Sequence, residues 1–225
     1  MILNKRNILV LLLIVMMNLI LGCENKDISK KEDLSKNSAL EDLNKDGIYT
    51  WYIDLTHDGK NEKIVVNTSP LYNMPEEGEK TVSIYSGETD DLIWSELIGE
   101  AHTINGSLRI YNDGEKDYLL KWNPYMSQGN ATYQYKIFNL SEEGEEILLA
   151  SNTFYYSMND MKDVDVIALR EFGKEINVYL EKAFVLAENG VNLGKGYSTD
   201  KEKRIAIYDV EADIKSIEKT LESMK

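Results

Sequence analysis

The chain has 225 residues and is strongly acidic, with 39 Asp and Glu residues against 25 Lys and Arg residues and a net charge of −14 at pH 7. Such a surface repels phosphate backbones, which argues against nucleic-acid binding and leaves cations as acceptable partners. The single cysteine excludes an intramolecular disulfide, so we expect stability to come from an ordinary hydrophobic core.

The first residues show the regions of an export signal. Lys5 and Arg6 supply positive charge, and the run from Ile8 to Leu21 is apolar apart from Asn18. This run of 14 residues is shorter than the roughly 20 that a membrane-spanning helix needs. It leads into residues 20–23, Ile-Leu-Gly-Cys, which resemble the lipobox of bacterial lipoproteins.

The lipobox resemblance implies that residues 1–22 are a signal peptide, which is removed, and that Cys23 carries a covalent diacylglycerol. The alternative is an uncleaved N-terminal anchor with a chance cysteine. Removal of the signal would take away two positive charges and change the net charge from −14 to −16. We therefore expect a protein anchored by lipid to the extracytoplasmic face of the cell membrane, since each buried acyl methylene contributes about 0.8 kcal/mol.

The next region changes from polar to β-forming sequence. Residues 23–45 are mostly Lys, Glu, Asp, Asn and Ser and predict a flexible tether, because they bury too little apolar area to offset the entropy of ordering. Residues 46–155 alternate β-forming runs with Asp-Gly, Asn-Gly and Glu-Gly pairs, a pattern typical of antiparallel hairpins. The expected strands are 49–53, 63–66, 81–85, 92–94, 107–111, 118–122, 132–138 and 147–149.

A weak internal repeat runs through this β-rich region. Similar segments recur 53 to 55 residues apart, which predicts two duplicated, blade-like β units. Chance alignment of strands and turns is the alternative. The recurring pairs are 58–59 with 113–114, 83–85 with 136–138, and 92–94 with 147–149.

Residues 156–225 predict an α-rich region packed on the sheet. Ser157 to Asp160 fits a helix capping box, and apolar residues then recur at helical spacing as far as Ala183. A strand at 204–208 precedes a final helix whose apolar stripe is Ile214, Ile217, Leu221 and Met224. The sequence therefore predicts an α+β fold: mainly antiparallel β, then a long amphipathic helix, a strand and a C-terminal helix.

The loop that follows the first expected strand carries oxygen-bearing side chains at alternate positions. Calcium takes 6–8 oxygen ligands in a flexible cage, so this spacing predicts a calcium site. The alternative is an Asx-type turn in which the same residues bond to the backbone. The proposed ligands are Asp54, Thr56, Asp58, the carbonyl of Lys60, and Glu62.

Together with the two strands after it, this loop resembles the FG-GAP/VCBS-like repeat of extracellular propellers. The resemblance covers about residues 48–96 and, more loosely, 107–150. It departs from the family pattern where Thr56 and Glu62 replace Asp, and the second copy lacks most of the ligand positions. The resemblance implies a blade-like sheet, and ligand or partner binding outside the cell without catalysis.

A second candidate site begins at Trp122 and is rich in aromatic, amide and hydroxyl groups, which suit carbohydrate or peptide recognition. The alternative is a long hairpin loop whose aromatic side chains cover the sheet. The proposed ligand-binding residues are Trp122, Tyr125, Gln128, Asn130 and Tyr133.

The sequence contains no recognisable catalytic constellation. His57 and His102 lack the spacing of metal ligands, and Cys23 is used for the lipid. We therefore expect no enzyme but a ligand-binding or accessory module at the cell envelope, whose partner is an unknown envelope protein or a soluble ligand. The alternative is a secreted hydrolase that acts on glycans through scattered carboxylates.

Overall fold

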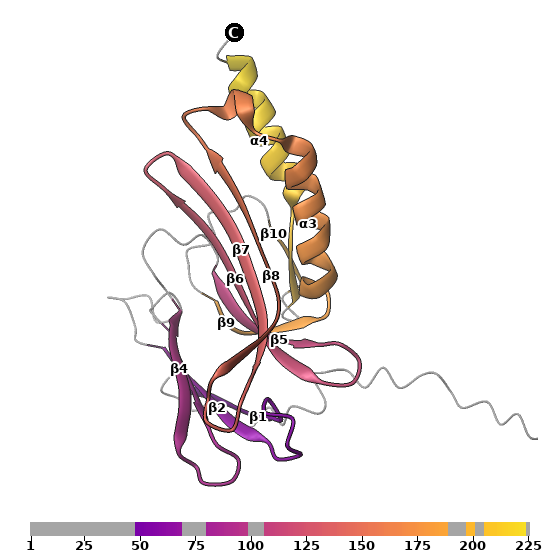
Figure 1. Cartoon of the computed structure of the whole chain (residues 1–225). Helices are drawn as coiled ribbons and strands as arrows, with labels where there is room; N and C mark the ends of the chain where they lie inside the picture. The colour runs from indigo at the N-terminus through magenta and orange to yellow at the C-terminus, as the bar shows by residue number, and fades with distance from the viewer. Residues whose placement is uncertain (1–47, 69–79, 99–105, 189–196, 201–204, 224–225) are drawn as a thin grey trace, which may run out of the picture. The chain divides into compact units, whose positions relative to one another are not determined.

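The structure is a computed structural model that describes residues 48–68, 80–98, 106–188, 197–200 and 205–223 (Figure 1). The chain divides into two compact units, Met1–Asn37 and Ser38–Lys225, and every described residue belongs to the second. The predicted signal peptide, Cys23, the tether, His102 and Met224 lie outside the described residues.

Two antiparallel meanders make up the β-rich part. The first is a four-stranded sheet in the order β1-β2-β3-β4. The second, β5 to β8, is joined at β5 by a later strand, β9, to give a five-stranded sheet in the order β8-β7-β6-β5-β9. The strands are β1 (Ile48–Ile53), β2 (Glu62–Thr68), β3 (Lys80–Tyr85), β4 (Leu92–Ile98), β5 (Ser107–Asn112), β6 (Asp117–Ser127), β7 (Asn130–Leu140), β8 (Glu146–Ser157) and β9 (Ala183–Glu188).

The helices follow the second meander. A 3-10 turn, η1 (Met161–Asp163), precedes α3 (Val166–Leu180), and α4 (Val210–Ser223) ends the described chain. A two-stranded pair, β10 (Tyr197–Asp200) and β11 (Ile205–Tyr208), lies between β9 and α4 in the sequence. The predicted α+β class, with mostly antiparallel strands and a C-terminal helix after a strand, is confirmed.

The segments that recur in the sequence lie at matching places in the two meanders. Asp58-Gly59 and Asp113-Gly114 each follow the first strand of a meander, and the other pairs fall on β3 with β7 and on β4 with β8. The two meanders therefore share their strand order, while duplication itself stays a prediction.

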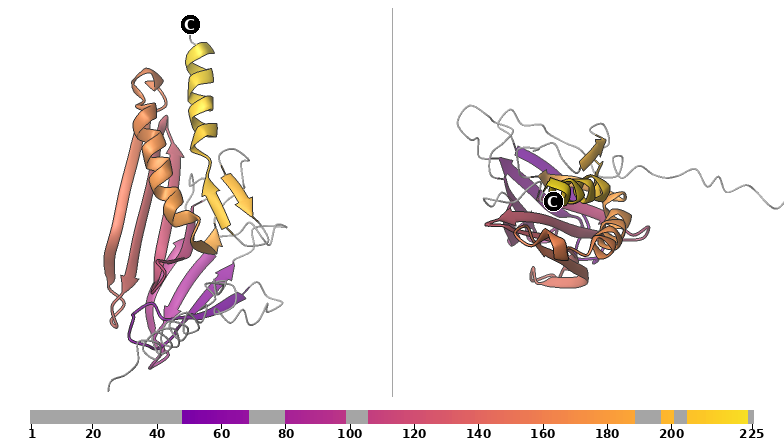
Figure 2. Two further views of the ribbon diagram at one scale, coloured as in Figure 1. Left: turned by 90° about the vertical axis from the view of Figure 1, so that its right-hand side faces the viewer. Right: turned by 90° about the horizontal axis from the view of Figure 1, so that it is seen from above.

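The five-stranded sheet is covered by helices on one face and, over part of the other face, by the four-stranded sheet (Figure 2). On one face it packs against α3 and α4, and on the other it packs against the four-stranded sheet. The helix-facing core includes Leu120, Trp122, Tyr133, Tyr135, Ile137, Leu169, Phe172, Ile176, Val210, Ile214 and Ile217. The core between the sheets includes Trp51, Ile53, Ile64, Val66, Val82, Ile84, Leu108, Ile110, Leu119, Phe138, Leu140 and Leu186.

The predicted long helix is wrong at both ends. Ser157 ends β8, and the helix begins only after Asp165, whose Oδ1 accepts hydrogen bonds from the backbone N–H groups of Ile167 (3.0 Å) and Ala168 (2.9 Å). At the other end, Ala183 starts β9, which sequence reasoning missed. Its first five residues are all buried, and such an unbroken apolar run is typical of a strand buried on both faces.

A half-buried carboxylate ties α4 to the five-stranded sheet and to β11. Asp213 on α4 accepts hydrogen bonds at Oδ2 from the hydroxyls of Tyr133 and Tyr208, each 2.7 Å long. Burial raises the pKa of Asp213 above its ordinary value, and the two tyrosine hydrogen bonds offset this only in part. The native state therefore holds the Asp213 proton more tightly than the unfolded chain does.

We predict that Asp213→Asn changes the pH dependence of stability. Because the folded pKa is raised, the stabilising contribution of Asp213 is present at low pH and is lost as pH rises through that pKa. The asparagine variant should therefore gain free energy of unfolding relative to the wild type between about pH 4 and pH 7, measured by urea denaturation.

The matched variant Asp213→Ala leaves two buried hydroxyls without their acceptor. Its free energy of unfolding should fall by about 1–3 kcal/mol at both pH 4 and pH 7, because a buried polar group without a partner carries that cost. Parallel pH curves for the wild type and Asp213→Asn would contradict the raised pKa of Asp213.

Candidate functional site

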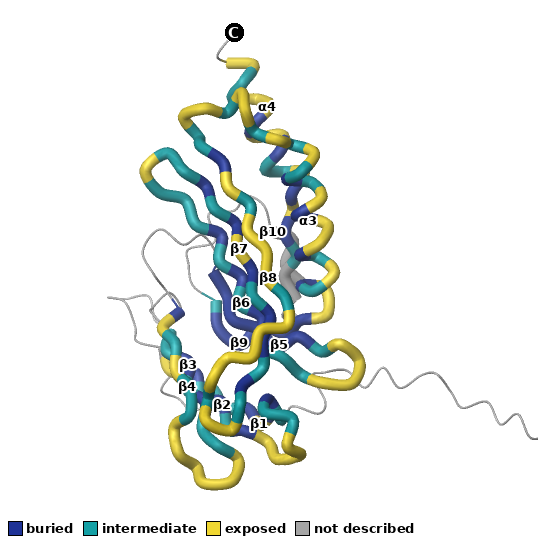
Figure 3. The backbone as a smooth tube through the Cα atoms, viewed as in Figure 1, coloured by how far each residue is buried: buried dark blue, intermediate teal, exposed yellow. Residues whose placement is uncertain are grey.

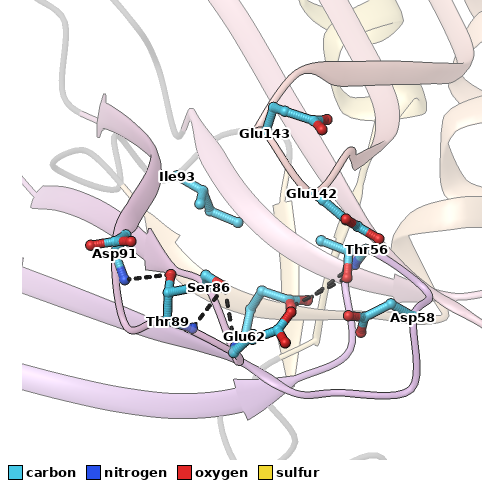
Figure 4. Close-up of a pocket in the computed structure, with 10 residues that line it drawn as sticks. Thr56, Asp58, Glu62, Ser86, Thr89, Asp91, Ile93, Glu142 and Glu143 are labelled. Atoms are coloured by element: carbon cyan, nitrogen blue, oxygen red, sulfur yellow. Dashed lines mark hydrogen bonds between the residues drawn. The ribbon is translucent and has the colours of Figure 1, made fainter.

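The Asp54–Glu62 loop lines an acidic pocket of about 290 Å³ (Figure 4). The pocket lies among the loop between β1 and β2, the turn between β3 and β4, and the turn between β7 and β8. Six of its ten lining residues are acidic, so the pocket attracts cations and repels anions. The lining residues are Thr56, Asp58, Glu62, Ser86, Glu88, Thr89, Asp91, Ile93, Glu142 and Glu143.

Two glycines let these turns approach closely. A Cβ atom on Gly87 would lie 2.5 Å from the carbonyl oxygen of Asn61, and one on Gly144 would lie 1.9 Å from that of Ile93. Gly144 also has a φ of +83°, which L side chains rarely adopt. The pocket therefore depends on backbone contacts that only glycine permits at these two positions.

Glu62 is the buried member of the pocket, with an exposed fraction of 2%. Its Oε2 accepts hydrogen bonds from the backbone N–H groups of Leu55 (2.6 Å) and Thr56 (3.0 Å), and its Oε1 accepts one from Thr56 Oγ1 (3.3 Å). Figure 4 shows the Glu62 and Thr56 side chains joined in this way. Glu62 thus satisfies the backbone of the loop that precedes it.

The two predicted aspartate ligands also bond to the loop backbone. Asp54 Oδ2 accepts a hydrogen bond from the N–H of Gly59 (3.1 Å), and Asp58 Oδ1 accepts one from the N–H of Lys60 (2.8 Å). Gly59, with a φ of +89°, takes the left-handed conformation that such a turn requires. The Asp58–Lys60 bond is that of an Asx turn, the alternative that the sequence left open, and the Asp54–Gly59 bond closes the loop over five residues.

The loop does not form a calcium cage in this conformation. The oxygens of Asp54, Asp58 and Glu62 are directed to different backbone N–H groups, whereas calcium needs 6–8 oxygens around one point. Asp54 Oδ1 is buried without a hydrogen-bond partner, but one such oxygen is far from a full set of ligands. No group of three or more His, Cys, Asp or Glu side chains in the described parts of the chain is placed to hold a metal ion. Calcium stays a prediction here.

The segment of the predicted second site forms a tight hairpin, not the long loop that was its alternative. β6 continues to Ser127 and β7 begins at Asn130, so only Gln128 and Gly129 form the turn. Trp122 and Tyr133 lie in the helix-facing core with exposed fractions of 0% and 2%, so their side chains are not presented at the surface of this structure.

The remaining predicted residues stay at or near the surface. Gln128 is exposed, and Tyr125 and Asn130 are half-buried. Asn130 Oδ1 accepts a 2.7 Å hydrogen bond from the hydroxyl of Tyr155 on β8, a residue that the sequence did not single out.

Strand alternation separates the buried residues from the accessible ones. Tyr133 and Tyr135 on β7 face the helices, so Thr132 and Gln134 face the opposite way. In the strand registers, each of these two residues has one neighbour on β6 and one neighbour on β8. We call the resulting surface the open face; it comprises Asn123, Tyr125, Thr132, Gln134, Thr153 and Tyr155, which are exposed or half-buried (Figure 3).

Comparisons with known proteins add no relative. None of the known protein families, curated proteins or solved structures matches this chain significantly. Among the helices of the described ranges, none is both long and apolar enough to cross a membrane.

We predict that Glu62→Ala destabilises the protein by at least about 2 kcal/mol, because two backbone N–H groups lose a buried acceptor. Glu62→Gln keeps one acceptor oxygen and should fall between the alanine variant and the wild type. The control is Glu142→Ala, an exposed acid of the same pocket, which should change the free energy of urea unfolding by less than about 0.5 kcal/mol.

Equal effects of Glu62→Ala and Glu142→Ala would contradict the structural role of Glu62. Repeating the unfolding in about 10 mM calcium tests the predicted ion, since ligand binding stabilises by mass action and extracellular sites bind at 0.1–1 mM. A calcium-dependent gain that Asp58→Ala abolishes would favour the cage over the turn.

Proposed function

We propose that this chain is a lipid-anchored, non-catalytic binding module outside the cell, and that its open face binds a neutral glycan. The observation that carries the proposal is the chemistry of the open face. Its six residues are two tyrosines, two amides and two threonines, with no charged side chain among them. In a chain of net charge −14, such a surface accepts a neutral polymer, and the two lysines of the adjoining row, Lys121 and Lys136, are already paired with Glu96 and Glu146.

The strand registers align these groups in rows. Tyr125 lies beside Thr132 and Thr132 beside Tyr155, so the two aromatic rings stand on strands two apart. Neighbouring strands are about 4.8 Å apart, which places the two backbones about 10 Å from each other. Two rings at this separation can contact two sugar units of one extended oligosaccharide, and the intervening hydroxyl can bond between them.

The second row supplies directional hydrogen bonds. Asn123 lies beside Gln134, and Gln134 beside Thr153. Amide and hydroxyl groups both donate and accept, as sugar hydroxyls do. Since these residues stand on paired strands, little conformational entropy is lost on binding.

The acidic pocket favours the second candidate, a glycan hydrolase, because carboxylates converge there. Its lining contains no aromatic residue on which a sugar ring could stack. Its one buried acid, Glu62, is already bonded to the backbone of its own loop. The open face therefore supports a binding function better than the pocket supports catalysis.

Anchoring is tested at Cys23. Because lipid attachment needs the thiol, Cys23→Ala should abolish acylation and signal cleavage, so no mature acylated protein should reach the membrane fraction. Metabolic labelling with a fatty acid and fractionation measure this. The control is Ser38→Ala, which should label normally. Acylated, normally processed protein from Cys23→Ala would overturn the anchor.

Glycan binding is tested with an array of neutral oligosaccharides and titration of the best probe. Tyr125→Ala and Gln134→Ala should each weaken binding about tenfold, or 1.4 kcal/mol. The control is Val178→Ala, an exposed residue on α3, which should bind like the wild type. Binding that is lost equally in the control, or retained in both variants, would remove the open face as the site.

A further inference from the structure

β8 forms one edge of the five-stranded sheet, because β7 is the only described strand that pairs with it. It is 12 residues long and most of its side chains are exposed, as the yellow tube in Figure 3 shows. An edge strand presents a row of unpaired backbone N–H and C=O groups to any other strand that approaches. Proteins usually block such pairing with Lys, Pro or a short strand.

β8 has neither Lys nor Pro and is not short, and its one irregularity is a register shift at Leu149, a bulge of the kind that can also protect an edge. After Glu146, residues 147–157 contain no charged residue and no proline. Ile147, Leu148 and Leu149 are consecutive and have exposed fractions of 50%, 57% and 54%. One register shift against β7 leaves Leu149 unmatched at the end of this run, but residues 150–157 pair regularly.

The apolar side chains of β8 are divided between its two ends. The aliphatic group, 147–149, lies near the start, and the aromatic group, 154–156, lies near the end, where the exposed fraction of Tyr155 is 59%. An antiparallel partner with the same sequence brings the aliphatic end of one strand to the aromatic end of the other. Aromatic and aliphatic side chains form favourable cross-strand pairs.

We propose that two copies of this chain associate through β8, antiparallel about a two-fold axis, so that two five-stranded sheets become one. The arrangement of aliphatic and aromatic ends favours a second copy as the partner, and the uncharged run 147–157 keeps charged side chains out of the contact between two chains of net charge −14. The register that uses the whole run 147–157 places Asn152 opposite Asn152 of the second copy. Leu149 then lies opposite Tyr155 of the second copy, and symmetry repeats the pair.

This pairing goes beyond the proposed binding function and does not depend on it. Leu149 and Asn152 are not part of the open face, but the pairing brings Leu149 beside Tyr155 of the second copy. Glycan binding is therefore compared at Tyr125 and Gln134, which lie on β6 and β7 and outside the proposed pair. A failure of the dimer would leave the glycan proposal standing, and the reverse also holds.

The oligomeric state is measured on the full chain carrying Cys23→Ala. Micelles are kept in excess over protein, so that two chains do not share a micelle by chance. Sedimentation at about 100 μM detects even a weak pair, since that concentration exceeds a Kd of 1 μM a hundredfold. We expect a dimer. Leu149→Lys should convert it to a monomer, because it puts a charge into the apolar pair, whereas Val178→Lys should remain a dimer. Val178 on α3 has nearly the same exposed fraction, 55%.

A cross-link tests the register. Directly opposed residues of antiparallel strands have Cα atoms about 4.5–5.5 Å apart, within the range of a disulfide. In the same Cys23→Ala chain, Asn152→Cys should therefore oxidise to a covalent dimer, whereas Val178→Cys should not. Circular dichroism checks that each variant is folded. A monomeric wild type, a dimer that survives Leu149→Lys, or no cross-link at residue 152 would overturn the proposal.

Discussion

The alternation of side chains along β6, β7 and β8, combined with helices on one face, determines most of what this protein presents to its surroundings. Residues such as Tyr133 and Tyr135 point toward α3 and α4 and build an aromatic core. Their immediate neighbours, such as Gln134, must then point the other way and remain accessible. Every second side chain along these strands is therefore buried in the core, and the side chains between them lie at the surface, where a ligand can reach them.

Local chemistry was enough to predict the strands of the two meanders, the strand β11 and most of the turns. Runs such as 81–85 and 132–138 match β3 and most of β7, because β-forming residues and Asp-Gly or Glu-Gly pairs act over a few positions. The same local signals misplaced the long helix. Ala183 continues the helical spacing, but the apolar run that it starts is needed to complete the sheet beside β5. Tertiary pairing decided that segment.

The candidate sites depended more heavily on contacts that are distant in sequence. Trp122 and Tyr125 stand three residues apart and looked equivalent, yet strand pairing buries the first and leaves the second at the surface. The acidic pocket needs Glu142 to reach the loop at Asp58, and no local pattern signals that meeting. The two glycine contacts that allow it, at Gly87 and Gly144, are visible only once the turns are placed. Alternation in β7 and β8 was the one sequence signal from which the open face could have been found.

β7 runs through both hydrophobic cores. Its first half contributes Tyr133 and Tyr135 to the helix-facing core, and its last residues contribute Phe138 and Leu140 to the core between the sheets. Loss of this strand would expose both cores at once, so β7 couples the helical layer to the small sheet. We therefore expect the stability of each core to depend on the other.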